Sequence, residues 1–230
     1  MNNISSSSTT AVTRIGLVED QFLFRQGMRA ILQTRQGLEV IFESAEGYTV
    51  VDQLKASAVL PDVMLVDLSL PPLGKEEFGG KEVALALRQH FPDIKIIILS
   101  GHEDENFIAD LIGNGAHGYL IKDSDPSEVF DAITAVITKG SYINPRALKA
   151  IQNQVSRKRV SPSFNTQLTK REEEVLQLIC LQLTSEEIAD KLSISVKTVH
   201  GYRISLLEKT NSINVAGLTL FAIKNGFVKL

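Results

Sequence analysis

Acidic side chains follow two of the apolar, strand-like runs of this sequence. Glu19 and Asp20 come after the first run, and Asp67 ends the third, while the hydroxyl of Ser100 ends the fourth and the ammonium of Lys122 follows the fifth. Carboxylates that converge repel one another unless they share a cation, and Mg²⁺ prefers such oxygen ligands. A lysine and a hydroxyl can each bind an oxygen of a phosphoryl group. The set therefore predicts a carboxylate that accepts a phosphoryl group with the help of Mg²⁺.

Each of these residues also has an ordinary structural interpretation. Asp67 could cap a loop, Ser100 could be a turn residue and Lys122 could be a solvated surface charge. Their common position at the ends of strands favours the functional interpretation, because parallel strands bring their carboxyl ends to one edge of the sheet.

The first part of the chain alternates short apolar runs with amphipathic stretches of helical period. This pattern predicts an α/β fold with a five-stranded, doubly wound parallel sheet. The expected strands are Ile15–Val18, Val40–Phe42, Val63–Val66, Ile94–Leu99 and Gly118–Ile121. The expected helices are Phe22–Gln33, Tyr48–Ala58, Lys81–Phe91, Glu105–Asn114 and Pro126–Thr138.

The last part of the chain shows four helical patterns and no strand, which predicts a small all-α domain. Two capping boxes, one beginning at Thr169 and one at Thr184, open the first two helices. Residues Glu186 to Thr210 are predicted to form a helix, a short turn and a second helix. Such a unit can place its second helix in the major groove of DNA, although an ordinary helical hairpin has the same pattern.

Charge divides the chain in the same way. Residues 1–139 contain 11 basic and 20 acidic residues, whereas residues 140–230 contain 13 basic and 7 acidic ones, within a net charge of -3. A basic second part favours a polyanionic partner there. We expect a disordered tail at 1–13, the α/β domain at 14–139, a linker at 140–167 and the helical domain at 168–230.

Residues 14–138 resemble a response-regulator receiver domain, which has the flavodoxin-like form of this fold. The resemblance rests on the Glu19–Asp20 pair, the segment 67–71 (Asp-Leu-Ser-Leu-Pro), Ser100 and the segment 118–123. It implies a phosphohistidine on a sensor histidine kinase as the donor. The implied roles are phosphoacceptor for Asp67, phosphoryl contact for Lys122, a switch pair of Ser100 and Tyr119, and Mg²⁺ ligation by Glu19, Asp20, Asp67 and the backbone carbonyl of Ser69.

Residues 168–228 resemble the LuxR/FixJ-type DNA-binding domain through the segments 168–176, 187–189, 194–199 and 222–226. Joined to a receiver domain, this identifies the chain as similar to the NarL/FixJ subfamily of response regulators. Such a regulator is expected to form a homodimer on double-stranded DNA when it is phosphorylated. The implied DNA contacts are Lys197, Thr198, His200, Tyr202 and Arg203.

Two features depart from these family patterns. The family has a glycine about four residues after the position of Pro71, whereas here Lys75 stands there, after Gly74, and the next glycines come at Gly79 and Gly80. A longer loop that tunes kinase choice or phosphoryl lifetime is therefore expected. On the second helix of the helical domain, Gly201 and Ile204 offer no side-chain hydrogen bond to bases, which favours recognition of DNA shape.

The remaining patterns limit the other classes of function. The segment Gly113–Gly118 has the spacing of a dinucleotide-binding loop, but a helix precedes it and a strand follows it, so we interpret it as a turn. No apolar run could cross a membrane and no signal-peptide pattern is present, which predicts a cytoplasmic protein. The resemblance to a DNA-binding regulator implies that the chain is not an enzyme. The alternatives are a Mg²⁺-dependent phosphohydrolase, which would lack a second carboxylate at Ser69, and a DNA-binding or interaction protein independent of phosphorylation.

Overall fold

A computed structural model describes residues 12–72, 79–101, 105–145, 147–149 and 168–228. Its first part is the predicted α/β domain, with five parallel strands in the order β2-β1-β3-β4-β5. The strands are β1 (Thr13–Val18), β2 (Leu38–Ser44), β3 (Val63–Asp67), β4 (Lys95–Ser100) and β5 (Gly118–Ile121). The helices are α1 (Phe22–Gln33), α2 (Val50–Ala56), α3 (Gly80–His90), α4 (Glu105–Gly113) and α5 (Pro126–Thr138).

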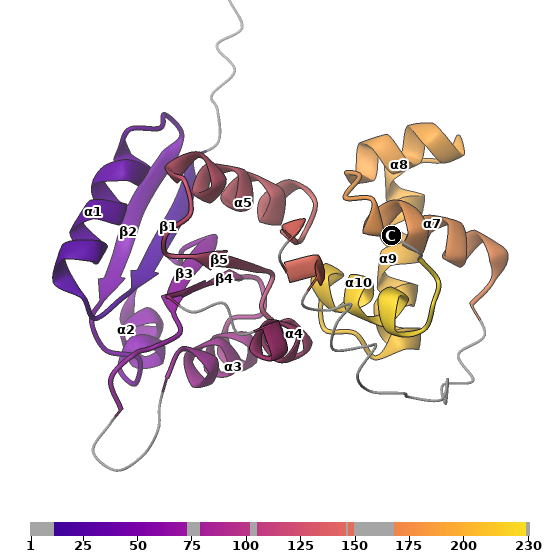
Figure 1. Ribbon diagram of the computed structural model, residues 1–230. Coiled ribbons are helices and arrows are strands. Elements are labelled where there is room, and N and C mark those ends of the chain that lie inside the picture. The colour runs from indigo at the N-terminus through magenta and orange to yellow at the C-terminus, as the bar shows by residue number, and fades with distance from the viewer. Residues whose placement is uncertain (1–11, 73–78, 102–104, 146, 150–167, 229–230) are drawn as a thin grey trace, which may run out of the picture.

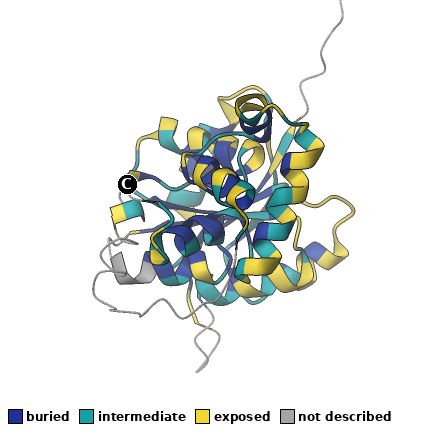
Figure 2. Cartoon of the chain, turned by 90° about the vertical axis from the view of Figure 1, so that its right-hand side faces the viewer, coloured by how far each residue is buried: buried dark blue, intermediate teal, exposed yellow. Residues whose placement is uncertain are grey.

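Helices cover both faces of this sheet (Figure 1). Alternate residues of each strand point to opposite faces, so Met64 and Val66 pack under α2, α3 and α4, while Val63 and Leu65 pack under α1 and α5. The strands are apolar throughout because both faces are buried. Figure 2 shows the buried residues gathered on the inward sides of the helices, with exposed residues on their outward sides.

The second part is the predicted all-α domain. Its helices are α7 (Lys170–Cys180), α8 (Ser185–Leu192), α9 (Val196–Thr210) and α10 (Val215–Lys224). The hydroxyls of Thr169 and Thr184 accept hydrogen bonds from the backbone of Glu172 and Glu187, as both capping boxes predict. Ser193 has a left-handed conformation and ends α8, and Ala189 and Val199 are buried where α8 meets α9. The helix, turn and helix predicted from the sequence are thus confirmed.

The long loop after β3 ends at a glycine that the packing requires. The backbone nitrogen of Gly80 donates to the carbonyl of Leu68 at 3.0 Å, and a Cβ atom at Gly80 would lie 2.1 Å from the carbonyl oxygen of Asp67. The start of α3 therefore lies directly against the backbone of Asp67. Gly80 lies nine residues after Pro71. Residues 73–78 of the longer loop, and residues 1–11 of the expected tail, lie outside the described residues.

The turn between α4 and β5 is confirmed at the dinucleotide-like segment. Helix α4 ends at Gly113, Gly115 has a positive φ of 112° and β5 starts at Gly118. In the part of the chain that the structure describes, no helix is long and apolar enough to cross a membrane.

Helix α10 lies between the α/β domain and the rest of the helical domain (Figure 1). Ala216 and Leu220 on α10 belong to the same buried cluster as Ile112 of α4 and Ala116 of the following turn. The two domains therefore share one apolar core along α4 and α10.

Candidate functional site

Three carboxylates meet at the carboxyl edge of the sheet. Glu19 and Asp20 follow β1, and Asp67 ends β3. Because β1 and β3 are neighbours and run parallel, the ends of these two strands lie side by side. One oxygen atom from each side chain lies within 4.8 Å of the others. Glu19 is 2% exposed and Asp67 is 0% exposed, so this acidic site is set into the protein and is not a patch on its surface.

Lys122, just after β5, reaches the same point. Its Nζ atom lies 3.1 Å from Oδ2 of Asp67 and 2.8 Å from Oε2 of Glu19. The ring of Phe24 on α1 lies beneath the ammonium group, with 4.8 Å between Nζ and the ring centroid. The edge of the sheet thus brings the predicted phosphoacceptor, two further carboxylates and the predicted lysine into one cluster.

Burial and mutual charge shift the pKa values of two groups in this cluster. Burial, with a contribution from the charge of Asp67, raises the pKa of Glu19, although the hydrogen bond from Lys122 acts in the opposite direction. Burial alone would lower the pKa of Lys122, but its bonds to Glu19 and Asp67 outweigh burial and raise it. Lys122 pairs with Glu19 and Asp67, and Asp20 adds a third carboxylate to the cluster, so acidic groups outnumber the lysine there.

Several oxygen atoms of the cluster are available to a metal ion. Oδ1 of Asp20 is buried and has no hydrogen-bond partner among the described residues. Oε2 of Glu19 and Oδ2 of Asp67 likewise lack a partner of hydrogen-bond geometry there, and each lies within ion-pair distance of Lys122. Inward-facing carboxylate oxygens without donors are the ligands that a hard divalent cation takes. The acidic site could therefore bind a metal.

The other residues of the predicted receiver site lie around this cluster. Ser100 is 1% exposed at the end of β4, and its carbonyl accepts a hydrogen bond from the backbone nitrogen of Lys122 at 2.8 Å. Tyr119 on β5 is 2% exposed and packs in the core shared with α4. The backbone nitrogen of Ser69 donates to Oδ1 of Asp67 at 3.2 Å, while the side chain of Ser69 is exposed.

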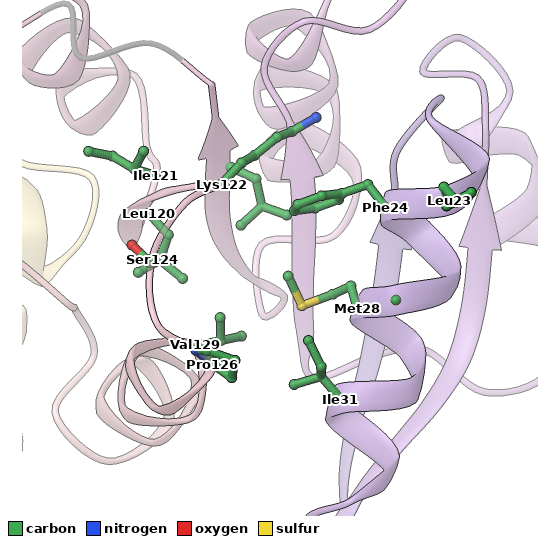
Figure 3. A pocket seen from close by; sticks show the side chains of 12 residues that line it. Leu23, Phe24, Met28, Ile31, Leu120, Ile121, Lys122, Ser124, Pro126 and Val129 are labelled. Carbon is green, nitrogen blue, oxygen red and sulfur yellow. The ribbon is translucent and has the colours of Figure 1, made fainter.

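A cavity of about 260 Å³ separates α1 from β5 and the start of α5 beside this site. Figure 3 shows Met28 and Ile31 of α1 facing Val129 of α5 across the cavity, with Phe24 next to Lys122 at its upper end. The acidic site thus has an apolar neighbour on its α1 side.

The predicted DNA contacts lie on α9, and their exposure differs. Lys197, Thr198 and His200 are exposed, while Tyr202 is partly buried against the core of the helical domain. Burial lowers the pKa of Arg203, and its Nε and Nη2 atoms have no hydrogen-bond partner among the described residues. The exposed face of α9 therefore runs through Lys197 and His200, with Arg203 at its side.

Glu172, which the sequence identified only as a capping residue, also anchors α9. It is 4% exposed and accepts hydrogen bonds from Ser205 at 2.8 Å and from Lys209 at 2.8 Å, both on α9. Its Oε2 atom accepts a further bond from the backbone of Thr169. One carboxylate thus holds the first helix of the domain and α9 together.

The sequence analysis did not predict three contacts that the structure shows, two at the acidic site and one between the domains. A guanidinium nitrogen of Arg25 donates to the backbone carbonyl of Glu19, and Phe24 supports Lys122, although both residues look like ordinary positions of an amphipathic helix. Asn214 bonds to the turn before β5. Its place before α10 identifies it as an N-cap, but no local pattern indicates its second partner.

Comparisons with known proteins agree with this arrangement. Residues 15–134 match the response regulator receiver domain family, and residues 166–222 match the family of bacterial regulatory proteins described as the luxR family. The transcriptional regulatory protein DegU of Brevibacillus brevis is 30% identical over 232 residues, covering 94% of this chain and 95% of that protein. The transcriptional regulatory protein YxjL of Bacillus subtilis (strain 168) is 33% identical over 220 residues, covering 94% of this chain and 97% of that protein.

Solved structures show the same fold. A LuxR-family two-component response regulator from Aurantimonas sp. SI85-9A1 superposes with a TM-score of 0.55 and 30% identity, over 63% of this chain and 98% of that one. RcsB of Salmonella typhimurium superposes with a TM-score of 0.56 and 22% identity, over 90% of this chain and 96% of that one. The chain belongs to the two-component response regulators, with an N-terminal receiver domain and a C-terminal LuxR-type DNA-binding domain, as the sequence predicts.

Proposed function

We propose that Asp67 accepts a phosphoryl group from a phosphohistidine of a sensor histidine kinase, and that this modification controls binding of the C-terminal domain to DNA. One observation carries the proposal: Nζ of Lys122 lies 3.1 Å from Oδ2 of Asp67, inside a cluster that also holds Glu19 and Asp20. Such a lysine can bind an oxygen of the phosphoryl group while it is transferred.

In the proposed transfer, a carboxylate oxygen of Asp67 attacks the phosphorus atom. A P–O bond to Asp67 forms as the P–N bond to the donor imidazole breaks, and the electron pair of that bond stays on the imidazole nitrogen. Lys122 binds one oxygen of the phosphoryl group, and the hydroxyl of Ser100 at the neighbouring strand end binds another. Gly80 keeps α3 close against the backbone of Asp67, which fixes the position of the nucleophile.

Mg²⁺ is the cation proposed for this site, and when bound it neutralises charge that accumulates on the phosphoryl oxygens. Glu19, Asp20 and Asp67 would hold it, together with the backbone carbonyl of Ser69. The residues fit such an ion because the buried Oδ1 of Asp20 has no hydrogen-bond partner in the described part of the chain, while Oε2 of Glu19 and Oδ2 of Asp67 have the ammonium group of Lys122 within ion-pair distance.

The histidine kinase requires access to Asp67 and a surface to bind. Phe22 and Leu23, at the start of α1 and two to three residues after Asp20, are 66% and 80% exposed. Large apolar side chains at that exposure favour contact with a partner. We assign this part of α1 to the kinase.

DNA binding follows from α9 and the charge of its domain. Lys197 and Arg203 would bind phosphates, which gives affinity and salt dependence but little sequence selectivity. Solved structures of RcsB include a complex with DNA and two dimers bound to two parallel DNAs. We propose that this chain likewise binds double-stranded DNA as a homodimer when it is phosphorylated, in the cytoplasm, as a regulator of transcription.

Phosphorylation is the step to test first. The full-length protein would be treated with acetyl phosphate and Mg²⁺ and its intact mass measured. We expect one added phosphoryl group in the wild type and in Asp123→Asn, which alters an exposed neighbour of Lys122, and none in Asp67→Ala. An unmodified wild type, or equal modification of Asp67→Ala, would contradict the proposal.

A parallel assay with a generic phosphomonoester separates the regulator from a Mg²⁺-dependent phosphohydrolase. Ser69 stands where such an enzyme would need a second carboxylate as general acid. We expect no turnover by the wild type beyond that of Asp67→Ala. Catalytic turnover that depends on Asp67 would favour the enzyme.

A further inference from the structure

The exposed face of α9 has no polar side chain in its middle, although this helix is proposed to contact DNA bases. Lys197, His200, Gly201, Ile204 and Glu208 are all exposed, and their spacing of three or four residues places them along one side of the helix. The first half of this stripe is basic, but its middle consists of a glycine and an aliphatic side chain, neither of which can donate a side-chain hydrogen bond.

No contact within the described part of the protein requires a glycine at position 201. It lies in the interior of a 15-residue helix, where glycine costs about 1 kcal/mol relative to alanine. A Cβ atom at this position would meet no other atom within 4 Å. Gly80 is the opposite case, because a Cβ atom there would collide with the backbone of Asp67. The space that Gly201 leaves open is therefore outside the protein, where a binding partner could approach the helix backbone.

Ile204 stands one helical turn further along the same face. Its side chain is 59% exposed, the largest value among the large hydrophobic residues of the helical domain that the structure describes. A single exposed aliphatic residue is common and needs no explanation by itself. Here it borders the open space above Gly201, on the face that the helix-turn-helix arrangement directs toward a major groove.

The major groove offers one apolar group that matches such a side chain. Each T·A pair presents the C5-methyl group of thymine there, and no other base pair does. Contact between this methyl group and an aliphatic side chain recognises thymine without a hydrogen bond. The basic residue Lys197 at one end of the stripe can hold the duplex backbone at the same time.

We propose that α9 recognises thymine by apolar contact: Gly201 lets the helix approach the base edges closely, and Ile204 packs on a thymine methyl group. This inference rests on the proposed DNA-binding function and makes it specific. The sequence favours recognition of DNA shape, whereas the proposed contact would recognise a T·A pair directly at a defined position of the binding site.

The test begins with selection of binding sites. Full-length protein treated with acetyl phosphate and Mg²⁺ would select duplexes from a random-sequence library, and each thymine of the selected sequence would then be replaced by uracil, which lacks only the methyl group. We expect uracil at one position to weaken binding by the wild type about fourfold, the effect of burying one methyl group. Ile204→Ala should bind the thymine and uracil duplexes equally.

Gly201→Ala provides the second variant. Because no atom lies near the added methyl group and alanine favours a helix, we expect its thermal stability to equal or exceed that of the wild type, while its affinity for the selected duplex falls about tenfold. Gly27→Ala is the matched control, since Gly27 is also an exposed helical glycine with nothing within 4 Å of its Cβ position. It should leave the affinity unchanged.

The outcomes separate this inference from the function on which it rests. If the wild type enriches no sequence, both sequence-specific DNA binding and the inference are wrong. If it enriches a sequence but uracil has the same effect on the wild type and on Ile204→Ala, or Gly201→Ala binds as tightly as the wild type, DNA binding stands and apolar recognition by α9 is overturned.

Discussion

The side-chain amide of Asn214 donates a hydrogen bond to the backbone carbonyl of Gly115 at 2.8 Å, which joins the DNA-binding domain to the receiver domain. The same amide group lies 3.2 Å from the carbonyl of Ala116. The Oδ1 atom of Asn214 accepts a bond from the backbone nitrogen of Gly217 at 2.9 Å and caps α10. Asn214 is 8% exposed, so both functions are carried out away from water.

Two substitutions at Asn214 separate these functions. Asn214→Asp keeps the acceptor that caps α10 but replaces the donor with a carboxylate oxygen that faces two carbonyl groups. We expect the domains to separate, with faster hydrogen exchange in the turn at 114–117 and a larger radius of gyration, while the helical domain remains stable. Asn214→Ala should separate the domains and also destabilise α10 by about 1 kcal/mol through loss of the cap.

Unchanged exchange and an unchanged radius of gyration in Asn214→Asp would show that the apolar contact alone holds the domains. Asn225→Asp serves as the control, because Asn225 also lies at an end of α10, and its side chain bonds, among the described residues, to Phe221 within its own helix.

A buried path connects the phosphoacceptor site with α10. Ser100 ends β4, and Tyr119 on the neighbouring β5 lies opposite Ile98, two residues before Ser100. Tyr119 belongs to the same apolar core as α4 and Leu220 of α10. We expect phosphorylation of the wild type to increase hydrogen exchange of α10, and we expect Ser100→Ala to accept a phosphoryl group on Asp67 without this increase. Intact mass and exchange would be measured on the same sample, with the exposed α5 variant Thr134→Ala as the control. A full exchange response in Ser100→Ala would exclude Ser100 as the link.

Glu172 predicts an acid-dependent stability of the DNA-binding domain. Burial alone would raise its pKa, but the hydrogen bonds from Lys209, Thr169 and Ser205 outweigh burial and lower the pKa to about 2. Because the folded-state pKa lies below the ordinary value of 4.5, the stabilisation is complete above pH 4.5 and is lost as the pH falls toward 2.

Glu172→Gln should therefore unfold at lower urea concentration at neutral pH, with a loss of about 2 kcal/mol, and the difference from the wild type should shrink below pH 4.5. Glu173→Gln, at the adjacent acidic residue, should change little. A difference that is independent of pH would mean that packing, and not the charge of Glu172, holds α9.

His117 gives the receiver domain a different dependence on pH. Burial, with a smaller contribution from the charge of Lys95, lowers the pKa of His117 to about 3, and its Nδ1 atom accepts a hydrogen bond from the backbone of Ile96 at 3.1 Å. The folded-state pKa lies below the ordinary value of 6.5, so the unfolded state binds the proton more tightly. Stability is complete above pH 6.5 and falls as the pH decreases toward 3.

His117→Asn can keep an acceptor for Ile96 without a titratable ring. We expect its urea midpoint to change less than that of the wild type between pH 6.5 and pH 5, whereas His90→Asn, at an exposed position, should follow the wild type. Parallel curves for the wild type and His117→Asn would refute the assignment of this pH dependence to His117.

Local pattern was sufficient to predict most of the fold and the phosphoacceptor cluster. Strands buried on both faces are apolar throughout, and side chains at their carboxyl ends must meet at one edge of the sheet. The sequence therefore places Glu19, Asp67 and Lys122 together. The cap of α5 at Asp125 was equally predictable, because an N-cap bond depends only on residues close in sequence.

Contacts between distant segments could not be predicted in this way. Leu220 has the pattern of a residue in the core of its own domain, yet it packs on the receiver domain, and only the three-dimensional arrangement shows which apolar face α10 turns toward α4. The displaced glycine at Gly80 is similar, since its need arises from the distance to the backbone of Asp67.

We propose that phosphorylation of Asp67 increases the affinity of the protein for DNA. The most direct measurement is the affinity of the full-length wild type and of Asp67→Ala for one selected duplex, with and without acetyl phosphate and Mg²⁺, at constant salt. We predict an increase of about tenfold or more for the wild type and no change for Asp67→Ala. Equal affinities of the wild type in the two conditions, at full phosphorylation, would contradict the claim.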